Sequence, residues 1–134
     1  MAVVIFDADV LIGFLNGTDA HHAAAVQRIH QALASGDRRV ISAVTYAEVI
    51  VGPYKAGAAH VERVDVMLQR FGIDVVAADR ATARAAAELR ARTRIGLPDA
   101  FVLAIAGRER SEGAHVRIES FDERVLKIAA SEVE

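Results

Sequence analysis

Cysteine is absent from this 134-residue chain. Its absence excludes disulfide bonds, thiolate metal ligands and cysteine nucleophiles, and fits a reducing compartment. No segment approaches the ~20 consecutive apolar residues that are needed to cross a bilayer. The first residues lack a basic stretch, and Asp7 and Asp9 interrupt their apolar run, which is not typical of a signal peptide. We therefore expect a soluble, cytoplasmic protein with no membrane association.

Excess charge of either sign is also lacking, because the formal net charge is -2. The chain as a whole therefore does not attract nucleic acid, and such a partner would need a local basic surface or bound cations. The length suits one domain that buries a proper core. We expect residues 1–134 to form that single domain.

Short apolar runs alternate with segments of helical character. The expected strands cover residues 3–6, 39–41, 73–76 and 116–118. The expected helices cover residues 9–15, 19–33, 42–52, 58–70, 79–94 and 98–106, with a last short helix that starts at 122. This alternation predicts a three-layer α/β/α fold with a mainly parallel central sheet of about four to five strands. A fifth strand would have to come from the last residues, which otherwise form a frayed tail.

Four carboxylates, Asp7, Glu48, Asp99 and Asp122, lie where apolar segments end or turn. Asp7 and Asp122 follow strands, Glu48 lies about two turns into a helix, and Asp99 lies in the first turn of another. Only Asp122 has a basic residue within four positions. Because ligands bind parallel sheets outside the carboxyl ends of the strands, we expect all four side chains to reach one edge of the sheet.

Oxygen donors without histidine or cysteine suit Mg²⁺ or Mn²⁺. A buried ionised carboxylate is unfavourable unless it is paired or binds a metal, and the helical neighbours of Glu48 offer no counter-charge. Such a cation activates water for phosphodiester hydrolysis. Without it, the clustered carboxylates should repel one another and titrate at raised, shared pKa values.

Several candidates also have an ordinary structural explanation. Asp9 is explained equally well as the cap of the next helix and as a further metal ligand. The helix dipole favours an acidic residue at Asp99 whatever its function, and Asp122 would make a good N-cap. Ser120 would either hold a metal-bound water or complete a turn.

Basic and aromatic residues offer weaker hypotheses. Arg92 and Arg94 lead from a helix into the loop before Asp99. They would either bind RNA phosphates near the acidic site or belong to a solvated helix face. Tyr46 would stack on a base or pack in the core or a dimer interface. We expect His21 to be an exposed or packing residue and not a ligand.

Four motifs together resemble the PIN-domain nucleases, and among them the VapC toxins of bacterial toxin-antitoxin pairs. They lie at residues 4–11, at 42–49 with Gly52, at 97–104 and at 120–122. The resemblance covers nearly the whole chain. No motif is specific alone, but their order and spacing are. Asp9 stands where the family often has Ser, Thr or Asn, and Ser120 stands where Thr is common.

The resemblance implies an Mg²⁺- or Mn²⁺-dependent endoribonuclease that cleaves structured RNA such as tRNA or rRNA. Asp7, Glu48, Asp99 and Asp122 match the acidic quartet of the family, with Ser120 and Thr45 as supporting residues. It further implies a homodimer that a VapB-like antitoxin holds inactive. The apolar surface of residues 46–54 and 61–68 is a candidate for either contact.

Two other functions fit part of the sequence. Asp7 and Asp9 also resemble the nucleophile and acid of haloacid-dehalogenase-like phosphatases. Those enzymes need a positioned lysine, and this chain has only Lys55 and Lys127, while Glu48 would have no role. A catalytically silent PIN-like domain that only binds RNA or protein is the second alternative.

Overall fold

A computed structural model describes residues 2–133, so the two end positions of the expected 1–134 domain lie outside it. The four strands are β1 (Ala2–Phe6), β2 (Arg38–Ser42), β3 (Ile73–Val76) and β4 (His115–Glu119). The helices are α1 (Ala8–Leu15), α2 (His22–Ser35), α3 (Ala43–Ala56), α4 (Ala58–Arg70), α5 (Arg80–Thr93), α6 (Leu97–Ser111) and α7 (Glu123–Val133). Within residues 2–133, no helix is long and apolar enough to span a membrane.

The strands form one parallel sheet in the order β3-β2-β1-β4. In its register, Ile5 of β1 lies opposite Val40 of β2 on one side and Ile118 of β4 on the other. The central strand β1 is the apolar, β-branched run at the start of the chain, as expected for a strand that is covered on both faces. The predicted parallel sheet is confirmed, with four strands.

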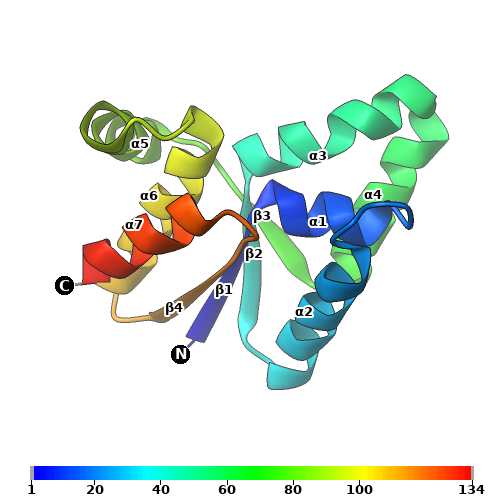
Figure 1. Ribbon diagram of the computed structural model, residues 1–134, viewed down its shortest axis with the longest axis horizontal. Coiled ribbons are helices and arrows are strands. Elements are labelled where there is room, and N and C mark those ends of the chain that lie inside the picture. Colours follow the sequence, from blue (N-terminus) through cyan, green and yellow to red (C-terminus); the bar gives the residue numbers. More distant parts are fainter. Residues whose placement is uncertain (1, 134) are drawn as a thin grey trace.

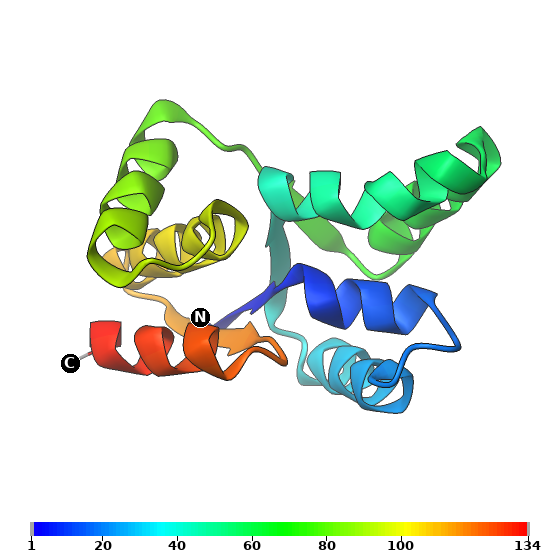
Figure 2. The same ribbon diagram turned by 45° about the horizontal axis from the view of Figure 1, so that its top comes forward.

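Helices cover both faces of the sheet, which gives the three expected layers (Figures 1 and 2). Helices α1 to α4 lie on one face, and α5, α6 and α7 lie on the other. The chain builds β1, β2 and β3 outward in one direction and then returns across the opposite face to place β4 on the free side of β1. The topology therefore changes direction between β1 and β4.

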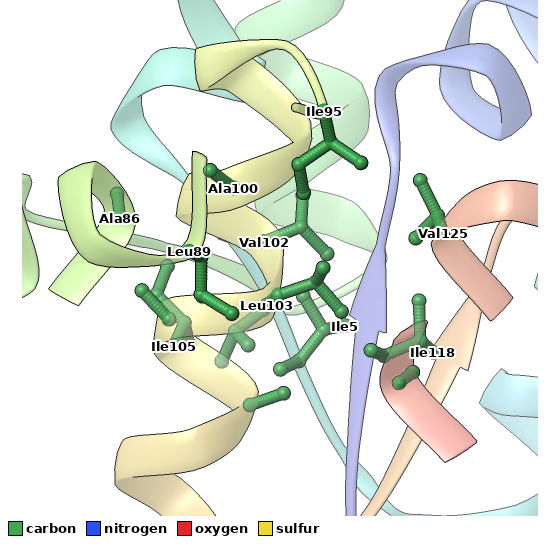
Figure 3. Close-up of a cluster of buried hydrophobic side chains, with 14 of the residues drawn as sticks. Ile5, Ala86, Leu89, Ile95, Ala100, Val102, Leu103, Ile105, Ile118 and Val125 are labelled. Carbon is green, nitrogen blue, oxygen red and sulfur yellow. The ribbon is translucent and has the colours of Figure 1, made fainter. Parts of the chain in front are cut away.

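Alternate side chains of β1 supply two separate cores. Val3 and Ile5 pack with the helices α5 to α7, whereas Val4 and Phe6 pack with the helices α1 to α4. Figure 3 shows Ile5 in the first of these cores, among side chains of α6, β4 and α7. All four β1 residues are at most 1% exposed, so this strand fixes the two helical layers against each other.

Three sequence predictions about the helices were wrong. Gly52 and Pro53 do not end the helix that carries Glu48, because α3 continues to Ala56. Its proline stands in the last turn, where one backbone bond is lost, and Val49 still packs in the core with residues of α4. The cap of α2 is His21 and not Asp19, and the last residues continue the predicted final helix to Val133 instead of forming a fifth strand or a frayed tail.

Candidate active site

The acidic residues gather where the topology changes direction. The ladder between β1 and β4 extends one step further, because the Asp7 amide donates to the Glu119 carbonyl over 2.9 Å. Asp7 therefore lies beside the short loop of residues 120–122 that follows β4. Figure 1 shows that this loop connects β4 to α7 near the end of β1. Ligands of open parallel sheets bind at such a point.

Asp7 lies at the centre of this site and is only 4% exposed. It is the N-cap of α1, since its Oδ1 accepts a hydrogen bond from the Ala8 amide at 2.8 Å. Its Oδ2 accepts one from the Ser120 hydroxyl at 2.8 Å. Both oxygens thus have neutral donors, and burial raises the pKa of the carboxyl group, with a contribution from the charge of Asp122.

Asp9 joins α1 to the loop after β4. Its Oδ2 accepts a hydrogen bond from the Phe121 amide at 3.0 Å, whereas its Oδ1 is buried without a hydrogen-bond partner. Because Asp7 caps α1, the expected capping role of Asp9 is wrong. Burial, followed by the charge of Asp7, raises the Asp9 pKa.

Ser120 is fully buried and connects two of the acids. Its hydroxyl donates to Asp7 and accepts a hydrogen bond from the Asp122 amide at 3.0 Å. Asp122 in turn accepts from the Arg124 amide at 2.9 Å, the bond of a residue that caps a helix, here α7. The hydroxyl and the cap together hold Asp122 next to Asp7.

Glu48 and Asp99 approach from two other helices. Glu48 on α3 is exposed, so the expectation of a buried glutamate was wrong: the side chain lies on the rim of a groove lined by Ile12, Leu15, Val49 and Val64. Asp99 is half-buried in the first turn of α6.

The pKa shifts indicate that these carboxylates act on one another. Partial desolvation of the Glu48 carboxyl group in the groove is the largest cause of its raised pKa, and the charges of Asp7 and Asp9 raise that pKa further. Burial also has the largest effect on Asp99, followed by the charges of Asp7, Asp122, Glu48 and Asp9, and together they raise its pKa to about 6. The predicted quartet and Asp9 therefore share one electrostatic environment.

No basic side chain neutralises this cluster. Among residues 2–133, none of the five acids forms an ion pair with Lys, Arg or His. Two arginines near β4 pair with other acids: Arg28 pairs with Glu119, and Arg117 pairs with Glu119 and Asp37. The site therefore concentrates negative charge at one edge of the sheet.

The donor set fits a hard divalent cation. Its side chains offer only carboxylate and hydroxyl oxygens, and two buried oxygens, Asp9 Oδ1 and Thr45 Oγ1, have no hydrogen-bond partner. Within the described residues, no three acidic or histidine side chains are placed closely enough to hold an ion as they stand. Cation binding would therefore draw the carboxylates together against their mutual repulsion.

The residues considered for RNA contact are in different situations. Arg92 pairs with Glu132 of α7 at 2.9 Å, whereas Arg94 has no ion pair within residues 2–133. Arg94 ends α5 with a positive φ of 65° in the segment that leads to Asp99. Tyr46 packs against the core and donates a 2.6 Å hydrogen bond to Asp65.

A parallel α/β fold with an oxygen-only acidic cluster at its switch point defines a class of metal-binding α/β domains. A family model, the PIN domain, matches residues 4–131, and the chain belongs to the PIN domain family. A search of functionally curated proteins found no significant match.

Solved structures share the fold. A toxin-antitoxin complex from Klebsiella pneumoniae contains a chain with 25% identity, with 89% of this chain and 86% of that chain covered and a TM-score of 0.65. The sarcin-ricin loop cleaving toxin VapC20 of Mycobacterium tuberculosis has 18% identity, coverage of 93% and 94%, and a TM-score of 0.67. DNA-bound VapBC from Salmonella typhimurium has 20% identity, coverage of 88% and 98%, and a TM-score of 0.56.

Proposed function

We propose that this chain is a divalent-metal-dependent endoribonuclease that cleaves structured RNA and acts as the toxin of a toxin-antitoxin pair. Its residues 1–134 would form a single PIN-like nuclease domain in the cytoplasm. The observation that carries the proposal is a cluster of five mutually repelling carboxylates in a PIN-domain chain, at the switch point of the sheet and without a basic partner in the described residues.

Asp7, Glu48, Asp99 and Asp122 would hold Mg²⁺ or Mn²⁺, and Asp9 offers a further oxygen. When bound, the cation lowers the pKa of a water molecule and offsets the charge that develops on the phosphate. Ser120 orients Asp7 by donating to its Oδ2. Thr45, one turn before Glu48 on α3, offers a buried hydroxyl without a partner as a supporting group.

RNA is the proposed substrate, and a nuclease with this net charge needs the cation and local arginines to hold such a polyanion. The structural neighbour from Mycobacterium tuberculosis cleaves the sarcin-ricin loop, an RNA element, and we propose a tRNA or rRNA substrate here. Arg94 is the better placed of the two candidate phosphate contacts, since Glu132 already engages Arg92.

A VapB-like antitoxin is the proposed protein partner, and we propose that the toxin is a homodimer. Two neighbours are toxin-antitoxin assemblies, and the apolar groove of α1, α3 and α4 opens beside Glu48. An amphipathic antitoxin segment would fill such a groove. A basic residue of that segment would then reach the carboxylates and compete with the cation through bidentate hydrogen bonds.

The test is cleavage of a panel of tRNAs and rRNAs by the purified protein, with and without Mg²⁺ or Mn²⁺. Asp7→Asn and Glu48→Gln remove one charge each with almost no change in shape, and Asp74→Asn on β3 is the matched exposed control. We expect metal-dependent cuts at defined positions by the wild type and the control, and none by the two site variants. Equal cleavage by all four proteins would refute the proposed site.

The same preparation separates the alternatives. A protein that binds RNA and cuts none under either metal would be the silent domain. Metal-dependent release of phosphate from small phosphomonoesters, lost in Asp7→Asn, would favour the phosphatase. That alternative has little support, because the only lysines, Lys55 and Lys127, lie in α3 and α7 with no contact to Asp7 among the hydrogen bonds and ion pairs of the described residues, and Glu48 would have no role.

A further inference from the structure

The loop between β4 and α7 has only three residues, Ser120, Phe121 and Asp122, and its middle residue is held from both sides. The Phe121 ring stacks on the His21 imidazole, with 4.4 Å between centroids and 13° between planes. The Arg28 guanidinium carbon lies 4.7 Å from the centroid of the same ring. Both contacts come from α2 and the residue that precedes it.

Arg28 also forms a hydrogen bond with the backbone of this loop. Its Nη1 donates to the Ser120 carbonyl at 3.1 Å and pairs with Glu119 at 3.2 Å. One side chain of α2 thus contacts three consecutive residues, 119, 120 and 121. The Arg28 side chain is 35% exposed and that of Glu119 is 13% exposed, so solvent screens this pair only partly.

The His21 side of the stack is anchored as well. His21 precedes α2, its amide donates to Asp19 Oδ1 at 2.8 Å, and its carbonyl accepts from the Ala25 amide. Because the backbone of His21 is already fixed at the start of α2, stacking of its ring on Phe121 costs little further conformational entropy. We call His21, Phe121 and Arg28 the clamp.

The other side of the loop faces the acids. The Phe121 amide donates to Asp9 and the Asp122 amide donates to the Ser120 hydroxyl, which itself donates to Asp7. Asp7 and Asp122 are both acidic and are linked through the Ser120 hydroxyl, so their charges repel each other across this loop. The Ser120 hydrogen bonds and the Asp122 cap oppose that repulsion on the inner side, and the contacts of Phe121 with His21 and Arg28 oppose it on the opposite side.

We propose that the clamp positions Asp122 and Ser120 against Asp7, so that His21, Phe121 and Arg28 are positioning residues for the reaction. The consequence for catalysis rests on the proposed nuclease function, whereas the consequence for loop geometry does not. None of the three would contact the substrate. Displacement of one reacting group by about 1 Å lowers rates by about a hundredfold, so a modest shift of Asp122 would be visible in kcat.

The experiment compares Phe121→Leu, Arg28→Met and the milder Arg28→Lys with the wild type. His21→Ala removes the stacked ring, and His21→Phe restores a ring without the imidazole. Arg117→Met is the matched control, because Arg117 also pairs with Glu119 but makes no hydrogen bond or stacking contact with the loop residues. The readouts are kcat and KM on an RNA that the wild type cuts, Mn²⁺ affinity without RNA, thermal stability, and amide hydrogen exchange at residues 121 and 122.

We expect the clamp variants to lose about ten- to a hundredfold in kcat with KM within about twofold of the wild type. Mn²⁺ affinity should weaken and the two amides should exchange faster, while His21→Phe and Arg117→Met stay close to the wild type. Unchanged kcat in Phe121→Leu and Arg28→Lys would overturn the inference. So would a rise in KM alone, because the residues would then contact RNA directly.

Failure of the nuclease proposal would be recognised separately. If the wild type shows no metal-dependent cleavage, Mn²⁺ affinity and amide exchange still decide the inference. Weaker Mn²⁺ binding and faster exchange in folded clamp variants would support it, and wild-type values in both would refute it. If Phe121→Leu does not fold, the same criteria apply to Arg28→Lys and to the two variants His21→Ala and His21→Phe.

Discussion

Ser120 illustrates how much of the site depends on one hydroxyl group. It is the only described side chain that bonds Asp7 and the Asp122 amide together, and it is fully buried. A hydroxyl can donate once and accept from others, which matches its two short bonds, to Asp7 and from the Asp122 amide, beside a longer 3.5 Å contact with Asp9 Oδ2. Its loss would leave a buried carboxylate oxygen and a backbone amide without these partners.

We therefore expect Ser120→Ala to lower the free energy of unfolding by about 1–3 kcal/mol, the range for a buried group left unpaired. The pKa of Asp7 should rise further, since the Ser120 hydrogen bond now lowers it. Urea denaturation measures the first effect. Ser131→Ala, which removes an exposed hydroxyl, is the control; equal stability losses in both variants would contradict the expectation.

Asp99 predicts the pH dependence of the metal-free protein. Its pKa is raised from 3.8 to about 6. Below both pKa values the group is protonated in the folded and unfolded states and does not change the free energy of unfolding. Between about 4 and 6 the folded state holds the proton more tightly, so this group makes stability fall as the pH rises, and above 6 the loss is complete.

Asp99→Asn mimics the protonated group at every pH. The difference in Tm between this variant and the wild type should be near zero at pH 4, grow towards pH 6 and then stay constant. Thermal unfolding in a chelating buffer across this range is the measurement. The exposed Asp74→Asn variant should show no such trend, and a pH-independent difference for Asp99→Asn would contradict the assignment.

At the level of elements, α3 is the helix whose sequence is least favourable for its own structure. It contains Gly52 in its interior and Pro53 in its last turn. An added Cβ at Gly52 would meet no atom within 4 Å, and the same holds for Gly107 in α6. These glycines are therefore tolerated and are not required by a close approach.

We expect Gly107→Ala to stabilise the protein by about 0.5–1 kcal/mol, because alanine loses less backbone freedom in a helix. Gly52→Ala should gain less, because Pro53 disfavours a helical residue with a Cβ directly before it. Gly36→Ala should have the opposite sign, since Gly36 ends α2 with a φ of +72°. Denaturant midpoints give all three values. A loss of stability in Gly107→Ala would contradict the expectation.

Local sequence patterns predicted the strands and the gathering of Asp7, Glu48, Asp99 and Asp122, but not the ends of some helices. Residues 3–6 could be recognised because an apolar, β-branched run needs cover on both faces. The continuation of α3 past Gly52 depends on packing with α4, which local propensity does not contain. The clamp was missed for the same reason: Arg28 and the Ser120 carbonyl are 92 positions apart in sequence.

The two ends of the strands differ in whether their acids are paired. The carboxyl ends of β1 and β4 carry the unpaired acids, whereas the start of β2 carries Arg38, which pairs with the buried Glu109 of α6 at 2.9 Å. Cations should therefore stabilise the fold through one edge of the sheet only.

Mn²⁺ at about 100 times its Kd should stabilise the protein by about 2.7 kcal/mol, because it binds the folded state alone. Proton release should accompany binding near pH 6, where Asp99 is partly protonated. Differential scanning fluorimetry and calorimetry in two buffers measure the two effects. Asp7→Asn should abolish both, and a Tm that does not respond to Mn²⁺ would contradict cation binding.

Asp7 is both the central acid of the site and the N-cap of α1. Asparagine caps a helix about as well as aspartate, whereas alanine does not. Where selection acts against the proposed toxic RNA cleavage, Asp7→Asn would thus remove the activity and leave the domain folded. Inactive copies of such a gene should retain an amide at position 7 more often than a methyl group, a bias that comes from helix capping and not from chemistry.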